Sequence, residues 1–75
     1  MFLIGGKIMI KVKVMDILNE RERNIRWLSK KCDIGYNTMY NFVMGKTNAI
    51  SYNVLEKVCT ILEVDIGDVL EIVKD

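Results

Sequence analysis

The fold of this chain is decided by one continuous stretch, Asn24-Ile-Arg-Trp-Leu-Ser-Lys-Lys-Cys-Asp-Ile-Gly-Tyr-Asn-Thr-Met-Tyr-Asn-Phe-Val-Met-Gly-Lys46. Apolar residues recur in it every three or four positions, which is the period of an amphipathic helix. They fall into two groups: Ile25, Leu28 and Cys32 in the first, and Met39, Phe42 and Val43 in the second. The stretch therefore predicts two short helices, over 25–32 and 36–44, with a tight turn between them.

The residues at the ends of these two helices are suited to start and stop them. Asn24 is a good N-cap for the first helix. Asp33 can adopt the left-handed conformation that ends a helix, although glycine adopts it at lower cost. Gly35 permits a new start, and Gly45 ends the second helix. We therefore expect a helix-turn-helix unit over 24–46.

The residues before this unit predict a strand and one further helix. A β-branched apolar residue stands at every second position from Ile8 to Val14, so we expect a strand over 8–14. From Met15 the period lengthens to that of a helix, which we expect over 15–22. Gly5-Gly6 marks a break in the pattern, and we expect residues 1–7 to be flexible.

The residues after the unit predict two more helical segments and a second strand. Ser51 can cap a helix over 52–62, and Asp65 can cap a short turn that ends at Leu70. The tail over 69–73 has strand character and can pair with the strand over 8–14, because isolated strands are not stable in water. The pattern predicts a mainly α fold with a small two-stranded antiparallel sheet made by the two ends.

Composition places this chain among small globular proteins. Its 75 residues are enough for a single domain over 1–75, and 51% hydrophobic residues with no proline suit a dense core. The apolar start, Met1-Phe2-Leu3-Ile4, is far shorter than the roughly 20 residues that cross a bilayer. We therefore expect a cytoplasmic protein with no membrane contact.

The charges are distributed unevenly along the chain. Residues 1–51 hold nine Lys/Arg and four Asp/Glu, a net +5, and residues 52–75 hold two Lys/Arg and six Asp/Glu, a net −4. One half can therefore face a phosphate backbone while the other faces away. Two ordinary solvated surfaces would give the same counts.

The sequence offers little for catalysis, metal binding or a small-molecule ligand. It has two cysteines, Cys32 and Cys59, and no histidine, whereas a structural zinc site takes four soft ligands. It has no glycine-rich phosphate loop and no nucleophile with a base at a known spacing. We expect no enzyme, no cofactor and no metal, and we expect both cysteines to be buried free thiols rather than a disulfide.

The spacing within the central stretch identifies a family. Ser29 is small enough to lie where two helices cross, and Asp33 follows it at +4, Met39 at +10 and Phe42 at +13. With Ile34 as a plug in the turn, this pattern resembles the helix-turn-helix of the Cro/CI, or Xre-like, repressor family. Residues 50–59 and 64–71 resemble the closing segments of that family, so the resemblance covers roughly residues 9–72.

This resemblance implies a lambda-repressor-like bundle of four to five short helices that binds double-stranded DNA. It matches best the small single-domain bacterial members of the family. The one departure is Asp33, which stands where the family has a turn glycine.

The second helix of the unit has an outward stripe that can read bases. Its members are Tyr36, Asn37, Tyr40, Asn41 and Met44. Repressors of the resembled family read bases from the first, second and sixth positions of this helix, which here are Tyr36, Asn37 and Asn41. Asparagine can bond both N6 and N7 of adenine in the major groove. We predict that Tyr36, Asn37, Tyr40 and Asn41 read bases; the alternative is an ordinary polar surface.

The resemblance also implies where the phosphate backbone is held. In the family the contacts come from the start of the first helix of the unit and from the loop after the second. The corresponding residues are Asn24, Lys46, Thr47 and Asn48. A helix N-terminus offers free N–H groups and partial positive charge to a phosphate. We expect Arg26, Lys30 and Lys31 to be solvated side chains that add to the positive field.

These observations predict a sequence-specific transcriptional regulator of the repressor type. One unit this small buries only about 600–1,000 Å² on DNA, so we expect a homodimer. The strand over 8–14 and Trp27 are candidate subunit contacts, although we favour packing of Trp27 in or near the core. The rival hypothesis is a protein-binding module, such as an antitoxin, because the same fold can hold a partner protein.

Overall fold

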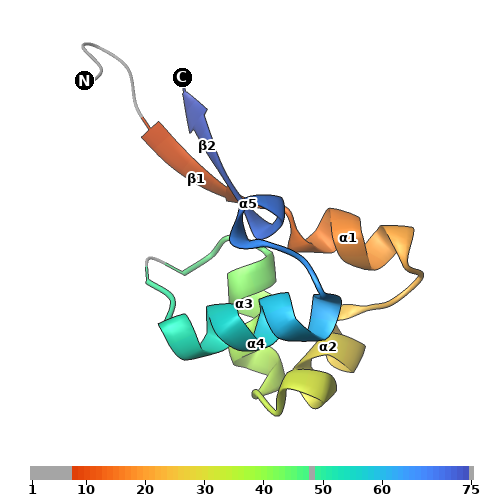
Figure 1. Ribbon diagram of the computed structural model, residues 1–75. Coiled ribbons are helices and arrows are strands. Elements are labelled where there is room, and N and C mark those ends of the chain that lie inside the picture. Colours follow the sequence, from red (N-terminus) through yellow and green to blue (C-terminus); the bar gives the residue numbers. More distant parts are fainter. Residues whose placement is uncertain (1–7, 48, 75) are drawn as a thin grey trace.

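The structure is a computed structural model that describes residues 8–47 and 49–74. Its elements in chain order are β1 (Ile8–Val12), α1 (Val14–Glu20), α2 (Ile25–Cys32), α3 (Tyr36–Val43), α4 (Tyr52–Leu62), α5 (Ile66–Val69) and β2 (Leu70–Lys74). The helices gather into one body, and the β1–β2 ribbon projects from it beside α5 (Figure 1). The expected flexible segment 1–7 and the predicted anchor Asn48 lie outside the described residues.

The inner faces of the helices meet in one apolar core. Every helix of the body contributes to its buried side chains, which are Val14, Leu18, Ile25, Leu28, Cys32, Met39, Phe42, Val43, Val54, Leu55, Val58, Leu62 and Val69. All six inward residues predicted for the two central helices are among them. Burial of one large apolar side chain is worth about 1.5–3 kcal/mol, so this cluster is the main stabilising feature of the body.

The turn between α2 and α3 forms as the sequence predicts. Asp33 adopts the left-handed conformation, with φ 56° and ψ 46°. The Ile34 N–H donates to the Ser29 carbonyl oxygen at 3.0 Å, which closes the turn. Ser29 itself is buried on α2, and its hydroxyl donates to the Arg26 carbonyl oxygen at 2.8 Å. A small, internally satisfied side chain at this point lets α2 and α3 pack closely.

The helix starts also follow the predicted caps. The Asn24 side-chain oxygen accepts a hydrogen bond from the Trp27 N–H at 2.8 Å, and the Ser51 hydroxyl accepts one from the Val54 N–H at 3.2 Å. Asp65 and Asp68 form a capping box at the start of α5. These bonds satisfy backbone donors that every helix start leaves free.

The first helix begins and ends earlier than predicted. It spans Val14–Glu20 instead of 15–22, because Val14 is fully buried in the core rather than placed at the end of the strand. The change of direction falls at Lys13, whose N–H donates to the Val69 carbonyl oxygen at 2.7 Å. Glu22 then takes a positive φ of 56°, which is incompatible with a continuing helix.

The predicted pairing of the two chain ends is confirmed. Strands β1 and β2 are antiparallel, with Val12 opposite Leu70 and Ile10 opposite Ile72. Val12 and Leu70 pack against the core, but Ile10 and Ile72, one pair further out on the same face, are 58% and 62% exposed. The sheet is therefore anchored at its base, and its outer part stands clear of the helices.

One of the two cysteines and the tryptophan take half-buried positions. Cys32 and Cys59 are both free thiols; Cys32 is buried as expected, but Cys59 is only half-buried, which corrects the prediction that both lie in the core. Cys59 lies on α4 beside the buried Val58, at the margin of the core-facing side. Trp27 is half-buried against the core, and the Arg23 guanidinium lies 4.9 Å from its ring centroid.

Candidate nucleic-acid interface

Helix α3 presents its predicted stripe because its opposite face is anchored in the core. Met39, Phe42 and Val43 are buried, so the other side of the helix must face outward. Tyr36, Asn37 and Asn41 are exposed on that side. Tyr40 differs from the expectation, since it is half-buried and packs against the core.

A row of two stacked aromatic rings with a cation at each end runs along this stripe. The Arg26 guanidinium carbon lies 4.9 Å from the centroid of the Tyr36 ring. The Tyr36 and Tyr40 rings stack with centroids 6.0 Å apart and an interplanar angle of 29°. The Lys46 ammonium nitrogen lies 5.4 Å from the centroid of the Tyr40 ring. The row therefore connects the start of α2, the face of α3 and the loop after α3.

This row contributes to the half-burial of Tyr40, which also packs against the core, and it adds a contact for Arg26. Tyr36 and Lys46 both lie against the Tyr40 ring and cover part of it. Arg26 is exposed, as expected of a solvated side chain, and its guanidinium lies over the Tyr36 ring. The spacing of Tyr36 and Tyr40, four residues apart on one helix, indicates that pair from sequence. The two cations come from other elements, and no spacing along the chain could place them on the rings.

The start of α2 presents polar groups beside the row. The Asn24 oxygen is occupied by its bond to the Trp27 N–H, so the Asn24 amide N–H groups are the part left to contact a ligand. The first turn of a helix carries unpaired N–H groups and partial positive charge, which favours an anion. Asn24 therefore stabilises the helix start and can donate to a phosphate at the same time.

The loop after α3 holds its residues through internal bonds. Gly45 has a φ of 70°, a left-handed conformation that suits glycine, and the Lys46 N–H donates to the Asn41 carbonyl oxygen at 2.8 Å. The Thr47 hydroxyl donates to the Ala49 carbonyl oxygen at 2.6 Å and accepts from the Ala49 N–H at 3.3 Å. Thr47 thus shapes the loop with its hydroxyl, and Lys46 is left as the charged group that faces outward.

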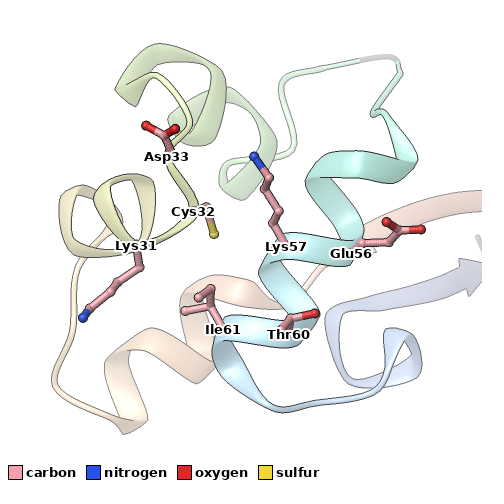
Figure 2. Close-up of a pocket in the computed structure, with 7 residues that line it drawn as sticks. All are labelled: Lys31, Cys32, Asp33, Glu56, Lys57, Thr60 and Ile61. Carbon is pink, nitrogen blue, oxygen red and sulfur yellow. The ribbon is translucent and has the colours of Figure 1, made fainter.

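A hollow elsewhere on the body lacks the features of an active site. It has a volume of about 440 Å³, lies between the end of α2 and α4, and is lined by Lys31, Cys32, Asp33, Glu56, Lys57, Thr60 and Ile61 (Figure 2). Glu56 and Lys31 point away from each other in this view, toward opposite sides of the hollow. Burial raises the pKa of the Cys32 thiol despite the nearby positive charge of Lys57, and a thiol of this kind is a poor nucleophile.

The part of the chain that the structure describes has neither a metal site nor a membrane-spanning helix. Within residues 8–47 and 49–74, no three side chains of the His, Cys, Asp and Glu types lie close enough to hold a metal ion. None of the helices described is both long enough and apolar enough to cross a membrane.

The fold and the stripe together define a class of protein. Two short helices joined at a left-handed turn, with the second helix held in the core and exposed along a polar stripe, form a helix-turn-helix DNA-binding unit. Residues 13–75 match the Cro/C1-type HTH DNA-binding domain, and the chain belongs to that family. The match confirms the family identified from the spacing of the central stretch. DNA is the partner that this family assigns to the domain.

Solved structures of similar shape agree with this fold. A proposed DNA-binding protein from Bacteroides fragilis superposes with a TM-score of 0.72 at 27% sequence identity, over 84% of this chain and 100% of that one. The transcriptional regulator VanUg superposes with a TM-score of 0.75 at 22% identity, over 100% of this chain and 97% of that one. The curated protein sequences contain no significant match to the chain.

Proposed function

We propose that this protein is a cytoplasmic transcriptional regulator, and not an enzyme, that reads a specific DNA sequence by placing α3 in the major groove. The observation that carries the proposal is the exposed asparagine pair on α3, flanked on the same stripe by two cations held over tyrosine rings. In the major groove, base edges lie between two phosphate backbones. The asparagine pair can therefore face the bases while the cation on either side faces a phosphate. The description of VanUg as a transcriptional regulator agrees with this role.

The proposal assigns base reading to α3. Asn37 and Asn41 are the direct readers, because an exposed asparagine amide can bond N6 and N7 of adenine together. Tyr36 lies at the start of α3 and can touch a thymine methyl group or a sugar. Tyr40 contributes the rim of the reading surface, since its ring is partly covered by Lys46.

The proposal assigns phosphate binding to the two ends of the row. Lys46 follows the end of α3, and Asn24 lies at the start of α2 with its amide N–H groups available. Arg26 joins them, because its guanidinium is positioned over Tyr36 on the same stripe. We assign the loop residues Thr47 and Asn48, which follow Lys46 in the sequence, to the same anchor, as the family implies. Cations held in place before binding lose less conformational freedom when they meet a phosphate.

We propose further that the protein acts as a homodimer on DNA. One domain offers too small an interface for tight specific binding, whereas two domains related by a two-fold axis contact two half-sites about 34 Å apart. A site selected from random duplexes should therefore show inverted symmetry.

The experiment separates reading from anchoring. Asn37→Ala and Asn41→Ala should each cost about 1–3 kcal/mol on a selected site and relax the preference at one base pair, with little change on random DNA. Lys46→Ala should weaken binding to all sequences alike and make the salt dependence shallower by about one unit. Thr38→Ala is the matched control, because Thr38 is exposed on α3 but lies outside the stripe.

Two results would overturn this assignment. If Asn37→Ala and Asn41→Ala bind the selected site as well as the unmodified protein does, α3 is not the reader. If the unmodified protein shows no salt-dependent binding to random DNA, the rival hypothesis of a protein-binding module is favoured instead.

A further inference from the structure

The start of α2 lies in a strongly positive segment of the chain. Residues 21–31 hold five Lys/Arg and one Glu, a net +4, whereas the whole chain carries only +1. The phosphate anchor proposed above uses two groups of this segment, Asn24 and Arg26. A third candidate is Arg23, which stands directly before Asn24 and is exposed.

Arg23 is held in place at two points. Its backbone N–H donates to the Leu18 carbonyl oxygen at 2.8 Å, and Leu18 is fully buried in the core. This bond ties the backbone of Arg23 to the end of α1. At the other point, the guanidinium carbon lies 4.9 Å from the centroid of the Trp27 ring. The charged group is therefore placed at the start of α2, although its side chain is exposed to solvent.

Trp27 is suited to hold this cation because the body holds Trp27. Its side chain is half-buried and packs against the core, and its backbone N–H donates to the Asn24 side-chain oxygen at 2.8 Å. Among aromatic rings, that of tryptophan attracts a cation most strongly. A leucine at this position could also pack at the margin of the core, but it would not attract the guanidinium of Arg23.

The start of α2 thus has two arginines on two separate rings. Arg23 lies over Trp27 on α2 and Arg26 lies over Tyr36 on α3, at 4.9 Å from the ring centroid in both pairs. Asn24 stands between the two arginines in the sequence. Because each cation has its own ring, the pair suits a ligand with repeated negative charges, such as a DNA backbone, better than one small anion.

We infer that Arg23 binds a backbone phosphate of DNA and that Trp27 is a positioning residue, which holds the guanidinium for this contact. The inference rests on the proposed function, because it adds a third group to the anchor at the start of α2. A planar guanidinium can donate two N–H groups to a phosphate and also stack on an aromatic ring. A cation that is placed before binding loses less conformational freedom when it meets the phosphate.

The test separates charge, ring and position with one set of variants. Arg23→Ala removes the charge, and Arg23→Lys keeps it without the planar guanidinium. Trp27→Leu removes the ring, and Trp27→Phe keeps a smaller one. Lys31→Ala is the matched control, because Lys31 is an exposed cation at the other end of α2, where it lines the hollow beside α4. Binding is measured on a selected site and on random DNA at several salt concentrations, and urea denaturation checks the fold.

The variants of Arg23 should change the salt dependence of binding. Arg23→Ala should lose about tenfold in affinity on selected and random DNA alike, and its salt dependence should become shallower by about one unit. Arg23→Lys should keep the salt dependence and lose less affinity, since lysine still neutralises a phosphate. Lys31→Ala should leave the salt dependence unchanged.

The variants of Trp27 should act only through Arg23. Trp27→Leu should keep the salt dependence and lose about two- to fivefold in affinity on all sequences, because Arg23 retains its charge but is less ordered. Trp27→Phe should recover most of this loss. Trp27→Leu should cost nothing further when it is combined with Arg23→Ala. A loss that persists in that double variant would overturn the positioning role, because the ring would then support the fold or touch DNA itself.

A local measurement comes from Trp27, which is the single tryptophan of the chain. Saturating random DNA should shield its fluorescence from quenching by acrylamide, because the phosphate backbone then lies against Arg23 over the ring. Lys31→Ala should show the same shielding. Unchanged quenching in the bound state would overturn the inference, since DNA would then not lie at this end of α2.

Two results of the binding measurements would overturn the phosphate contact of Arg23. If Arg23→Ala and Lys31→Ala have the same effect, Arg23 acts only through the general positive field. If Arg23→Ala changes the base preference, Arg23 contacts a base instead.

Failure of the proposed function gives a different result. A protein that binds random DNA with the expected salt effects, but prefers no sequence, would lose base reading by α3 and keep the Arg23 contact. A protein that binds no DNA at all would lose both. Sequence-specific binding that Arg23→Ala leaves unchanged would overturn the inference alone.

Discussion

The helical body and the β1–β2 ribbon use similar apolar side chains with different results. In the body, Leu28 and Phe42 are at most 1% exposed, because helices cross on several sides of them. In the ribbon, Ile10 and Ile72 are mostly exposed, because no described element lies over them. The difference shows that an apolar pattern fixes which face of an element turns inward, whereas burial depends on whether another element covers that face.

The largest expected effect contrasts one side chain from each region. Phe42→Ala should lower the free energy of unfolding by about 3–5 kcal/mol, because it leaves a cavity in the core. Ile72→Ala should change it by only about 0.5 kcal/mol at dilute protein, since the side chain is already in water. Urea denaturation followed by circular dichroism measures both. A comparable loss in the two variants would mean that the ribbon is part of the folding core.

A smaller effect separates the two cysteines within the body. Burial raises the pKa of both thiols, and at Cys59 the negative charges of Asp65 and Asp68 raise it further. Because the thiolate is the reactive form, both should alkylate more slowly than a free cysteine near pH 8, and both rates should keep rising above the pH at which an ordinary thiol is fully ionised.

The two thiols differ in how easily a reagent in solvent reaches them. Cys32 is buried and Cys59 is half-buried, so Cys32 should react roughly tenfold more slowly, and the difference should vanish in denaturant. Mass spectrometry of peptides labelled at several pH values measures each rate. Faster native labelling of Cys32 than of Cys59 would contradict the burial of Cys32 at the end of α2.

The smallest expected effect concerns the row of cations and rings. Tyr40→Leu removes the ring beneath Lys46, and an exposed cation–π contact is worth about 0.5–1 kcal/mol. Affinity for DNA should fall about two- to fivefold, equally on selected and random sequences, because Lys46 remains but is less ordered. Tyr52→Leu is the control, since Tyr52 is 82% exposed at the start of α4. A change in base preference would instead make Tyr40 a direct reader.

Much of the body could be predicted from the sequence because its signals are local. Asn24, Asp33 and Ser51 act on backbone groups within a few residues, and each takes the predicted role. The bounds of α2 and α4 follow from these caps together with the apolar period. The candidate stripe on α3 was predictable for the same reason, since three buried residues on one helix define its outward face.

The features that sequence reasoning missed depend on contacts between distant segments. The position of Arg26 over Tyr36 requires α2 and α3 to be packed first. Cys59 lines a hollow with Asp65 and Asp68, so its half-exposure depends on where α5 lies relative to α4. Val14 fits equally well as the end of a strand or the start of a helix, and the core decides in favour of the helix.

The register of the ribbon has a consequence for the order of folding. Because Ile8 pairs with Lys74, the sheet forms only when nearly the whole chain has been closed into a loop. The helices and the turn at Asp33 need only local contacts, which form faster than pairings between distant residues. The helical body should therefore assemble first and the ribbon last. Separation of the strand ends can then occur repeatedly while α3 stays in place.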